Sequence, residues 1–421
     1  MTDHVPIRDC SVASLDELEP GNYFPMWLGD EQLRQTALNG VVASWGMRRP
    51  FYIRQNGILS VMCGRGRDIR EVYTDAERFT VVAPKREGYE LFDMFGGLES
   101  VLQMDGARHN RVRKLMNPSF TPQAIDAQQA DVVRIIDEQL DKIAESGPEF
   151  DAMVDFADKL IPRIMLEGSF KLSPAHIAVF GQMQDEMNKL PSYDAAEGLP
   201  PSFMQAIGGV SEAIAEIIRI RRETPGPDLI SSLISAREEG DKLTDNELFG
   251  QINSIATAGI GTTANTLGGA LMLFCRHPET KAELLAEPGL VDNAIEECLR
   301  LNGPGIVSFV RFAACDTEVG GTRIPKDMPV YVSPLASGYD PSEYEDPFRF
   351  DIRRKIRAPL VFGSGIHHCI GRRLARNILR TALLRMLERF PDLKLVDPGF
   401  QPSYRGLTGE LAPLSIPMRT H

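Results

Sequence analysis

The chain has 421 residues and a net charge of −12, from 46 Lys and Arg against 58 Asp and Glu, and we expect no nucleic-acid partner. Its first twenty residues are mostly polar and acidic, which argues against a secretion signal or an N-terminal membrane anchor. The six cysteines lack the spacing of a disulfide framework, so we expect reduced thiols in a cytoplasmic protein.

Along the chain, strand-like stretches precede and follow a helical middle. The β-rich parts are expected near 45–65 and 305–335, where β-branched and aromatic residues gather between turn residues. The predicted strands are 51–53, 58–63 and 330–332, and the predicted helices are 123–145, 202–222, about 245–276, and 372–390.

The predicted helix at 245–276 contains residues 252–275, which carry no charge and are long enough to raise the possibility of a membrane span. Its asparagines, threonines and glycines suit a hydrocarbon environment poorly. Thr244 and Glu247 form a capping-box pattern at its start, so we expect a long buried helix. Because a glycine inside a helix costs about 1 kcal/mol relative to alanine, Gly259 and Gly261 suggest close approach to a ligand.

The segment FGSGIHHCIGRRLAR at residues 362–376 is the most informative part of the sequence. A helix that begins just after Cys369 would direct backbone N–H groups at its sulfur and favour the thiolate, which binds metals. Gly365 and Gly371 can bring the backbone close to a flat ring or adopt left-handed angles. The alternative is that Cys369 is a buried cysteine that only packs in the core. A zinc site fits poorly, because no second pair of ligands has the required spacing.

This segment resembles the haem-binding signature F-x-x-G-x-(H/R)-x-C-x-G of the cytochrome P450 superfamily. The resemblance implies a mainly α fold with small β-sheets, in one haem domain over 1–421 with its haem-cysteine loop at 362–371. It also implies haem b as cofactor and Cys369 as the iron ligand. The other implied haem contacts are Phe362, Gly363, Gly365, His367, Gly371 and Ala375, together with the propionate anchors His109, Arg113, Arg311 and His367.

Two further motifs resemble structural landmarks of the family. Glu297 and Arg300 match E-x-x-R, whose spacing places both charges on one helix face. The segment 347–350 resembles P-x-R-F, whose arginine, here Arg349, joins that pair. The resemblance implies a buried carboxylate with two guanidinium partners behind the haem. A solvated ion pair on a helix surface is the alternative for the E-x-x-R pair alone.

The segment 258–263 resembles the oxygen-binding A-G-x-(D/E)-T-T motif of the family. The implied catalytic residues are Ala258, Gly259, Gly261, Thr262 and Thr263, with Thr262 as hydrogen-bond partner of the activated oxygen. Gly261 departs from the family pattern, because an acid usually stands there. Our hypothesis is that water in the vacated space, held by the two threonines, carries protons. The alternative is a reaction with different proton needs, such as peroxide-driven oxygenation.

A basic run surrounds the cysteine segment. Residues 349–389 hold 11 Lys and Arg against Asp351 and Glu388, a local charge of +9. This charge would steer an acidic electron donor, so we expect docking at Arg372, Arg373 and Arg376. The implied partners are a separate ferredoxin and its NAD(P)H-dependent reductase.

The substrate is expected to be a small apolar molecule. The pocket residues carried over from the family are Tyr89, Phe92, Phe95, Ile255, Ile306, Val307, Ser308 and Leu407, although ordinary core packing would explain each equally well. Three functions remain open: a ferredoxin-dependent monooxygenase, which is favoured; a haem-thiolate peroxygenase, isomerase or dehydratase; and a non-catalytic haem sensor. We expect a monomer.

Overall fold

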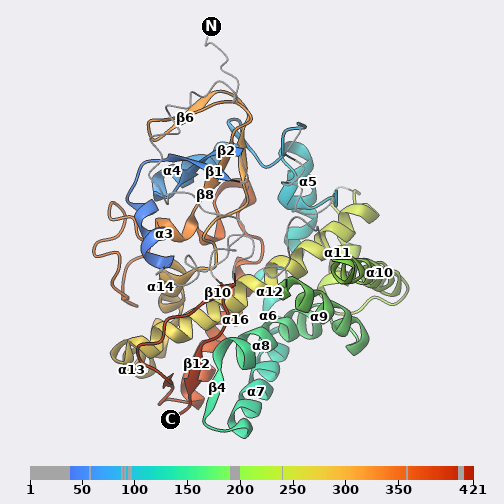
Figure 1. Ribbon diagram of the computed structural model, residues 1–421. Coiled ribbons are helices and arrows are strands. Elements are labelled where there is room, and N and C mark those ends of the chain that lie inside the picture. Colours follow the sequence, from blue (N-terminus) through green and yellow to red (C-terminus); the bar gives the residue numbers. More distant parts are fainter. Residues whose placement is uncertain are drawn as a thin grey trace.

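The five-stranded sheet lies at one end of the molecule, a large helical part follows, and a three-stranded sheet lies near the opposite end beside the C-terminus (Figure 1). The computed structural model describes residues 38–55, 58–86, 89, 92, 97–189, 200–238, 240–356, 359–405 and 412–421. Its strands are β1 Phe51–Gln55, β2 Ile58–Cys63, β3 Phe79–Thr80, β4 Glu149–Asp151, β5 Arg311–Ala313, β6 Thr317–Val319, β7 Thr322–Ile324, β8 Pro329–Val332, β9 Lys394–Leu395, β10 Tyr404–Arg405, β11 Ala412–Pro413 and β12 Pro417–Arg419.

The helices account for most of the described chain. The α-helices are α3 Leu38–Gly46, α4 Gly66–Thr74, α5 Gly106–Met116, α6 Pro122–Asp126, α7 Gln129–Ser146, α8 Asp158–Pro162, α9 Pro174–Lys189, α10 Pro201–Glu223, α11 Leu229–Ser235, α12 Asp245–Arg276, α13 Pro278–Ala286, α14 Val291–Asn302, α15 Pro334–Ser337 and α16 Arg372–Arg389. The short 3₁₀ helices are η3 Val101–Gln103, η4 Asn117–Phe120, η8 Pro288–Leu290, η9 Leu360–Phe362 and η10 Gly365–His367, and π-helical turns form η5 Ala152–Ala157 and η6 Arg163–Ser169.

The largest sheet has the strand order β1-β2-β8-β5-β3. β1 and β2 form an antiparallel hairpin, and β2 pairs in parallel with β8, which joins segments far apart in the chain. Side chains of β2, β8 and α4 pack together in one core cluster, which includes Val61, Ile69 and Val330. Both β-rich parts are therefore where the sequence predicted them.

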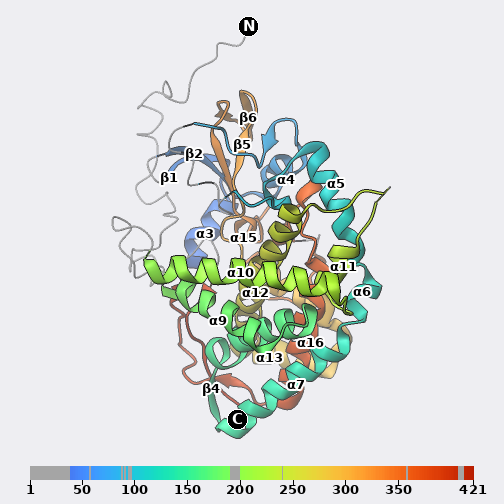
Figure 2. The same cartoon turned by 90° about the vertical axis from the view of Figure 1, so that its right-hand side faces the viewer.

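Helix α12 crosses the middle of the helical part, with α10 lying across it (Figure 2). Its 32 residues match the predicted bounds, and Thr244 and Glu247 form both hydrogen bonds of the capping box. The helix is buried on nearly all sides towards its C-terminal end, as expected for an apolar helix inside a core. It packs on α14, on α16 and on the η5 turn, so several elements fix its position in the core.

The mainly α fold with small sheets is thus confirmed. The predicted run 123–145 is divided into α6 and α7, whereas α10 and α16 agree with their predicted ranges within one residue. Among the described residues, no helix has both the length and the apolar character that a bilayer span requires.

Candidate functional site

Cys369 lies in a tight loop between η9 and α16. The Cys369 N–H donates to the Phe362 carbonyl over 2.8 Å, and the His368 N–H donates to the Gly365 carbonyl over 3.2 Å. Gly363 and Gly365 have φ of +70° and +69°, angles that disfavour side chains. A Cβ at Gly365 would also lie 2.3 Å from the Tyr73 carbonyl of α4. Glycine at 365 is therefore explained by its packing on α4.

The other glycine of the signature has a different environment. Gly371 is the N-cap of α16, at φ −79°, and a Cβ built there meets no atom of the described residues within 4 Å. Its carbonyl accepts from the Ala375 N–H over 2.9 Å in the first turn of the helix. The space beside Gly371 is open, as a planar ring next to Cys369 would require.

The electrostatic surroundings of Cys369 differ from those of the other described thiols. Burial raises the pKa of Cys63 and Cys298 far above the usual range and that of Cys275 to about 12. Burial also raises the pKa of Cys369, but there the backbone N–H groups of Gly371 and Arg372 and the charges of Arg113 and Arg372 oppose it. Helix N–H groups therefore act on this sulfur as predicted, and they are suited to a thiolate that binds a metal.

The expected propionate anchors form a buried polar cluster beside this loop. The rings of His109 and His367 lie 4.4 Å apart between centroids. His367 Nε2 contacts Asp105 Oδ1 at 2.9 Å. Burial would raise the pKa of Asp105, but hydrogen bonds from His367, Thr80 and Val81 outweigh it and lower that pKa.

Two groups of the cluster are poorly satisfied by the described protein. His109 is 1% exposed, and its Nε2 has no hydrogen-bond partner among the described residues. Arg311 is 5% exposed and donates to the Phe309 carbonyl over 3.0 Å, and no carboxylate in the described ranges pairs with it. Buried charges and polar groups normally have partners. The cluster therefore fits an added carboxylate-bearing group such as haem.

Arg113, the fourth expected anchor, contacts the cysteine loop itself. Its Nη2 donates to the His368 carbonyl, and burial lowers its pKa while the nearby Cys369 raises it. Its guanidinium thus supports the cysteine loop directly, and of the four expected anchors it is the one committed to protein backbone next to the sulfur.

The middle of α12 contains a stretch of accessible residues, with a buried residue directly before it and directly after it. Residues 257–262 all retain accessible surface, whereas Ala256 and Thr263 are buried. Thr262 Oγ1 donates to the Ala258 carbonyl over 2.6 Å. A Cβ at Gly259 would approach Met165 Cε to 3.0 Å, so packing against this flexible side chain is one reason for a glycine here, and close approach to a ligand stays a prediction. Thr263 is turned into the core.

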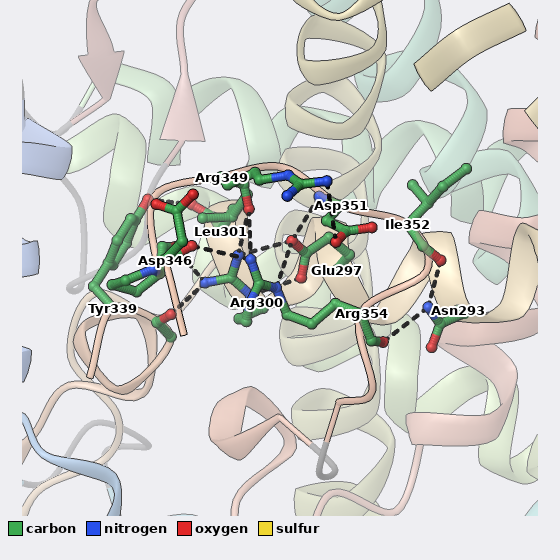
Figure 3. Close-up of polar contacts among 12 residues, drawn as sticks. Asn293, Glu297, Arg300, Leu301, Tyr339, Asp346, Arg349, Asp351, Ile352 and Arg354 are labelled. Carbon is green, nitrogen blue, oxygen red and sulfur yellow. Dashed lines mark hydrogen bonds and ion pairs between the residues drawn. The ribbon is translucent and has the colours of Figure 1, made fainter. Parts of the chain in front are cut away.

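The E-x-x-R pair is fully buried (Figure 3). Arg300 donates to both carboxylate oxygens of Glu297, over 2.6 and 2.8 Å, and to three backbone carbonyls. The expectation for Arg349 is wrong. Its side chain is 66% exposed and contacts Asp351 at 3.7 Å, while only its carbonyl accepts from Arg300. The second guanidinium is Arg354, whose Nε lies 3.3 Å from Glu297 Oε1.

Several expected pocket residues are core residues in the structure. Tyr89 and Phe92 pack on the ring of Phe312 at centroid distances of 5.9 and 5.1 Å, and the Tyr89 hydroxyl donates to the Asp327 carbonyl. Ile306 is 0% exposed. Ordinary packing thus explains these three, and Val307 is also buried. Ile255 and Ser308 keep accessible surface, and Phe95 and Leu407 lie outside the described residues.

The basic run is largely neutralised by carboxylates from other helices. The pairs are Arg353 with Glu283 and Glu287, Arg354 with Glu297, Arg376 with Glu296, Arg380 with Asp292, Arg385 with Asp137, and Arg389 with Asp141. The guanidinium of Arg376 also lies over the Phe362 ring, 4.3 Å from its centroid. Arg376 is therefore a support of the cysteine loop, and the local charge of +9 overstated the free positive surface. Arg372 and Arg373 form no ion pair within the described ranges.

Sequence reasoning missed Asp105, Glu296 and Arg354. The only signal for Asp105 was its place four residues before His109, because the capping role expected of an Asp at a helix start is not the one that it has. Glu296 and Arg354 had none, since their partners come from other segments.

Comparisons with known proteins agree with this geometry. The family model described as Cytochrome P450 matches residues 49–398. Cytochrome P450 CYP107DY1 of Priestia megaterium is 31% identical over 341 residues, which cover 79% of this chain and 82% of that protein. The 6-deoxyerythronolide B hydroxylase of Saccharopolyspora erythraea is 33% identical over 293 residues, or 69% of this chain and 70% of that protein. Epothilone C/D epoxidase of Sorangium cellulosum is 30% identical, and the match covers 80% of each chain.

The solved structure of the cytochrome P450 PksS of the Bacillus subtilis bacillaene polyketide synthase superimposes with a TM-score of 0.83 at 25% identity, covering 93% of this chain and 98% of that one. The family model spans the cysteine loop, α12 and the E-x-x-R helix together. The chain therefore belongs to the cytochrome P450 family, as an oxidoreductase of the monooxygenase type that binds haem b.

Proposed function

We propose that the protein inserts one atom of O₂ into a small apolar substrate, using electrons from a separate ferredoxin. The observation that carries this proposal is the stretch 257–262 of α12, which includes Thr262 and in which every residue keeps accessible surface, while Ala256 and residues 263–272 are buried. Haem b with a thiolate ligand supplies the chemistry of O₂ cleavage when it is bound. The residues of the chain bind the cofactor, orient the substrate and move protons.

The binding roles follow from the cluster beside the cysteine loop. Cys369 is the proposed iron ligand, with Phe362, Gly363, Gly365, Gly371 and Ala375 around it. His109 and Arg311 are proposed partners of the propionates, because within the described part of the chain the buried Arg311 guanidinium pairs with no carboxylate and the buried His109 Nε2 has no hydrogen-bond partner. His367 is proposed with them because its ring lies against that of His109. Arg113 would act on the loop.

Thr262 has one hydroxyl hydrogen, which it donates to the Ala258 carbonyl. It can therefore accept a hydrogen bond from a neighbouring water without any change, and it can donate to a ligand only by releasing Ala258. Thr262 would therefore hold a water beside this stretch, and its hydroxyl could pass a proton on only after it releases the Ala258 carbonyl.

Gly261 replaces the acid that usually supplies protons, and α12 carries no carboxylate between Glu247 and its end. Glu247 is itself held by the helix cap and by Arg111. We therefore propose that water along residues 257–262 delivers the protons. Thr257 is the second hydroxyl there, since it is exposed and Thr263 is buried.

The test is the coupling of NAD(P)H oxidation to product in Gly261→Asp, compared with Thr257→Val. An acid at 261 should change hydrogen peroxide release and rate, and Thr257→Val should increase peroxide release. Unchanged coupling in both variants would remove this route. Higher turnover with added peroxide than with ferredoxin would instead favour the peroxygenase alternative, which the glycine at 261 keeps in consideration.

For the electron donor, we propose docking at Arg372 and Arg373, which lie in the first turn of α16 directly after the cysteine loop. An acidic ferredoxin would be steered by these charges. The double variant Arg372→Glu/Arg373→Glu should slow haem reduction and weaken its salt dependence. Arg380→Glu/Arg385→Glu is the control with the same charge change, placed on the pairs with Asp292 and Asp137. Equal effects from both double variants would refute a local docking site.

We propose an apolar substrate, supported by relatives whose names describe a hydroxylase of 6-deoxyerythronolide B and an epoxidase of epothilones. A ligand screen for the shift of the haem from low to high spin, followed by product analysis with ferredoxin and reductase, tests it. Binding without any product would favour the sensor alternative.

A further inference from the structure

Asp105 stands at the N-cap of α5 but does not cap the helix. Its backbone has the extended angles of an N-cap, φ −127° and ψ 173°, and its side chain makes no capping hydrogen bond. An N-cap Asp normally accepts from the N–H groups of the first turn, which stabilises a helix by about 1 kcal/mol. The carboxylate at this position is therefore used for something other than the helix.

Both carboxylate oxygens are bound by other segments. Oδ2 accepts from the Thr80 hydroxyl over 2.6 Å and from the Val81 N–H over 2.8 Å. Oδ1 contacts His367 Nε2 at 2.9 Å, across 262 positions of the sequence. The side chains of Asp105 and His367 are 20% and 10% exposed, so solvent screens their contact little.

His367 is only two residues from Cys369, and its ring also packs against the ring of His109. The loop that carries the cysteine is thus attached to α5 and to the strand end at Thr80 through one carboxylate. Charge-assisted hydrogen bonds of this kind are the strong ones, and a group held before its ligand arrives binds that ligand at lower entropic cost.

We propose that Asp105 is a positioning residue for the haem-binding loop: it holds His367, and through it the loop, in the arrangement that receives the cofactor. This inference rests on the proposed role of His367 as a propionate partner. Asp105 acts through His367 and needs no contact with the haem itself.

The test measures the rate at which the ferric holoenzyme loses haem to excess apomyoglobin. Asp105→Ser keeps a good N-cap but is one bond too short for His367, so α5 should remain intact by circular dichroism. Because a hydrogen bond to a charged group is among the stronger ones, haem loss should accelerate by about 10- to 100-fold. Thr80→Val, which removes one bond to Oδ2 and leaves Oδ1 free to contact His367, should accelerate it less.

A double-mutant cycle decides whether the effect runs through His367. Asp105→Asn should accelerate haem loss in the parent and add nothing in the His367→Ala background, because its partner is already absent. Additive effects, or parental rates in Asp105→Ser and Thr80→Val, would overturn the inference. Parental haem loss in His367→Ala would overturn both the inference and the anchor assignment.

The carbon monoxide spectrum of the ferrous parent is recorded on the same samples. A parent without the long-wavelength band would refute the proposed function independently of these rates.

Discussion

Replacing Arg300 by Met is expected to be the most damaging change in the network behind the cysteine loop. Both side chains of the Glu297–Arg300 pair are 0% exposed, and Arg300 donates five hydrogen bonds. Removing one partner of a buried pair costs about 3–5 kcal/mol. The free energy of unfolding of a globular protein is usually about 5–15 kcal/mol, so this loss is a large part of the stability.

Two matched variants separate the side chains that the sequence could not. Arg354→Ala removes the 3.3 Å contact to Glu297 and donors to the Asp346 and Arg349 carbonyls, so about 1.5–3 kcal/mol should be lost. Arg349→Ala removes an exposed guanidinium and keeps the carbonyl that Arg300 uses, so the change should stay within about 0.5 kcal/mol.

The assay is urea unfolding of the holoenzyme, followed by far-ultraviolet circular dichroism and by Soret absorbance. The expected order of destabilisation is Arg300→Met, then Arg354→Ala, then Arg349→Ala. An Arg349→Ala variant as unstable as Arg354→Ala would refute the assignment of the second guanidinium. That comparison stands even if Arg300→Met yields no folded protein.

Four further substitutions have expected outcomes. Gly365→Ala would place a Cβ 2.3 Å from the Tyr73 carbonyl oxygen at φ +69°, so both thermal stability and haem content should fall. Gly371→Ala would place a Cβ with no atom of the described residues within 4 Å, so this variant should keep the fold and lose haem content alone. Normal haem loading of Gly371→Ala would show that the open space is not the haem site. Cys369→Ser should abolish the long-wavelength absorption of the ferrous carbon monoxide complex, and a retained band would mean another ligand. Hydrogen bonding from Lys171 lowers the pKa of Asp131 below its usual 3.8. The charged carboxylate therefore stabilises the fold above that pH, and this stabilisation is lost as the pH falls through the lower pKa of the folded state. In Asp131→Asn the stability should fall less steeply below about pH 4, and an unchanged profile would contradict the pairing.

Features that depend on neighbouring residues could be predicted from the sequence. The bounds of α12 follow from the capping box at Thr244 and Glu247 and from the charge-free run after it. The positive φ of Gly365 and the i, i+3 pairing of Glu297 with Arg300 are local as well. The family and its cofactor followed from the residues around Cys369, because their order and spacing are specific.

Features that depend on distant segments could not. The basic run predicted a free positive surface, yet Arg376 pairs with Glu296 and Arg385 with Asp137, carboxylates that only helix packing brings near. Tyr89 and Phe92 suggested a pocket, but their rings pack on Phe312 in the β-sheet. The type of side chain was informative in each case, and its partner was not.

The amino-acid sequence by itself indicated, through the resemblance of the segment around Cys369, an oxidoreductase of the P450 type with haem b, and it placed the long internal helix that passes through the helical part. The tertiary structure alone decided which groups stand behind that loop: Asp105 on His367, Arg354 on Glu297 and Glu296 on Arg376. The physical reason is range. Caps, turns and helix spacing act over a few residues, whereas a buried charge takes its partner from whichever segment the packed core places beside it.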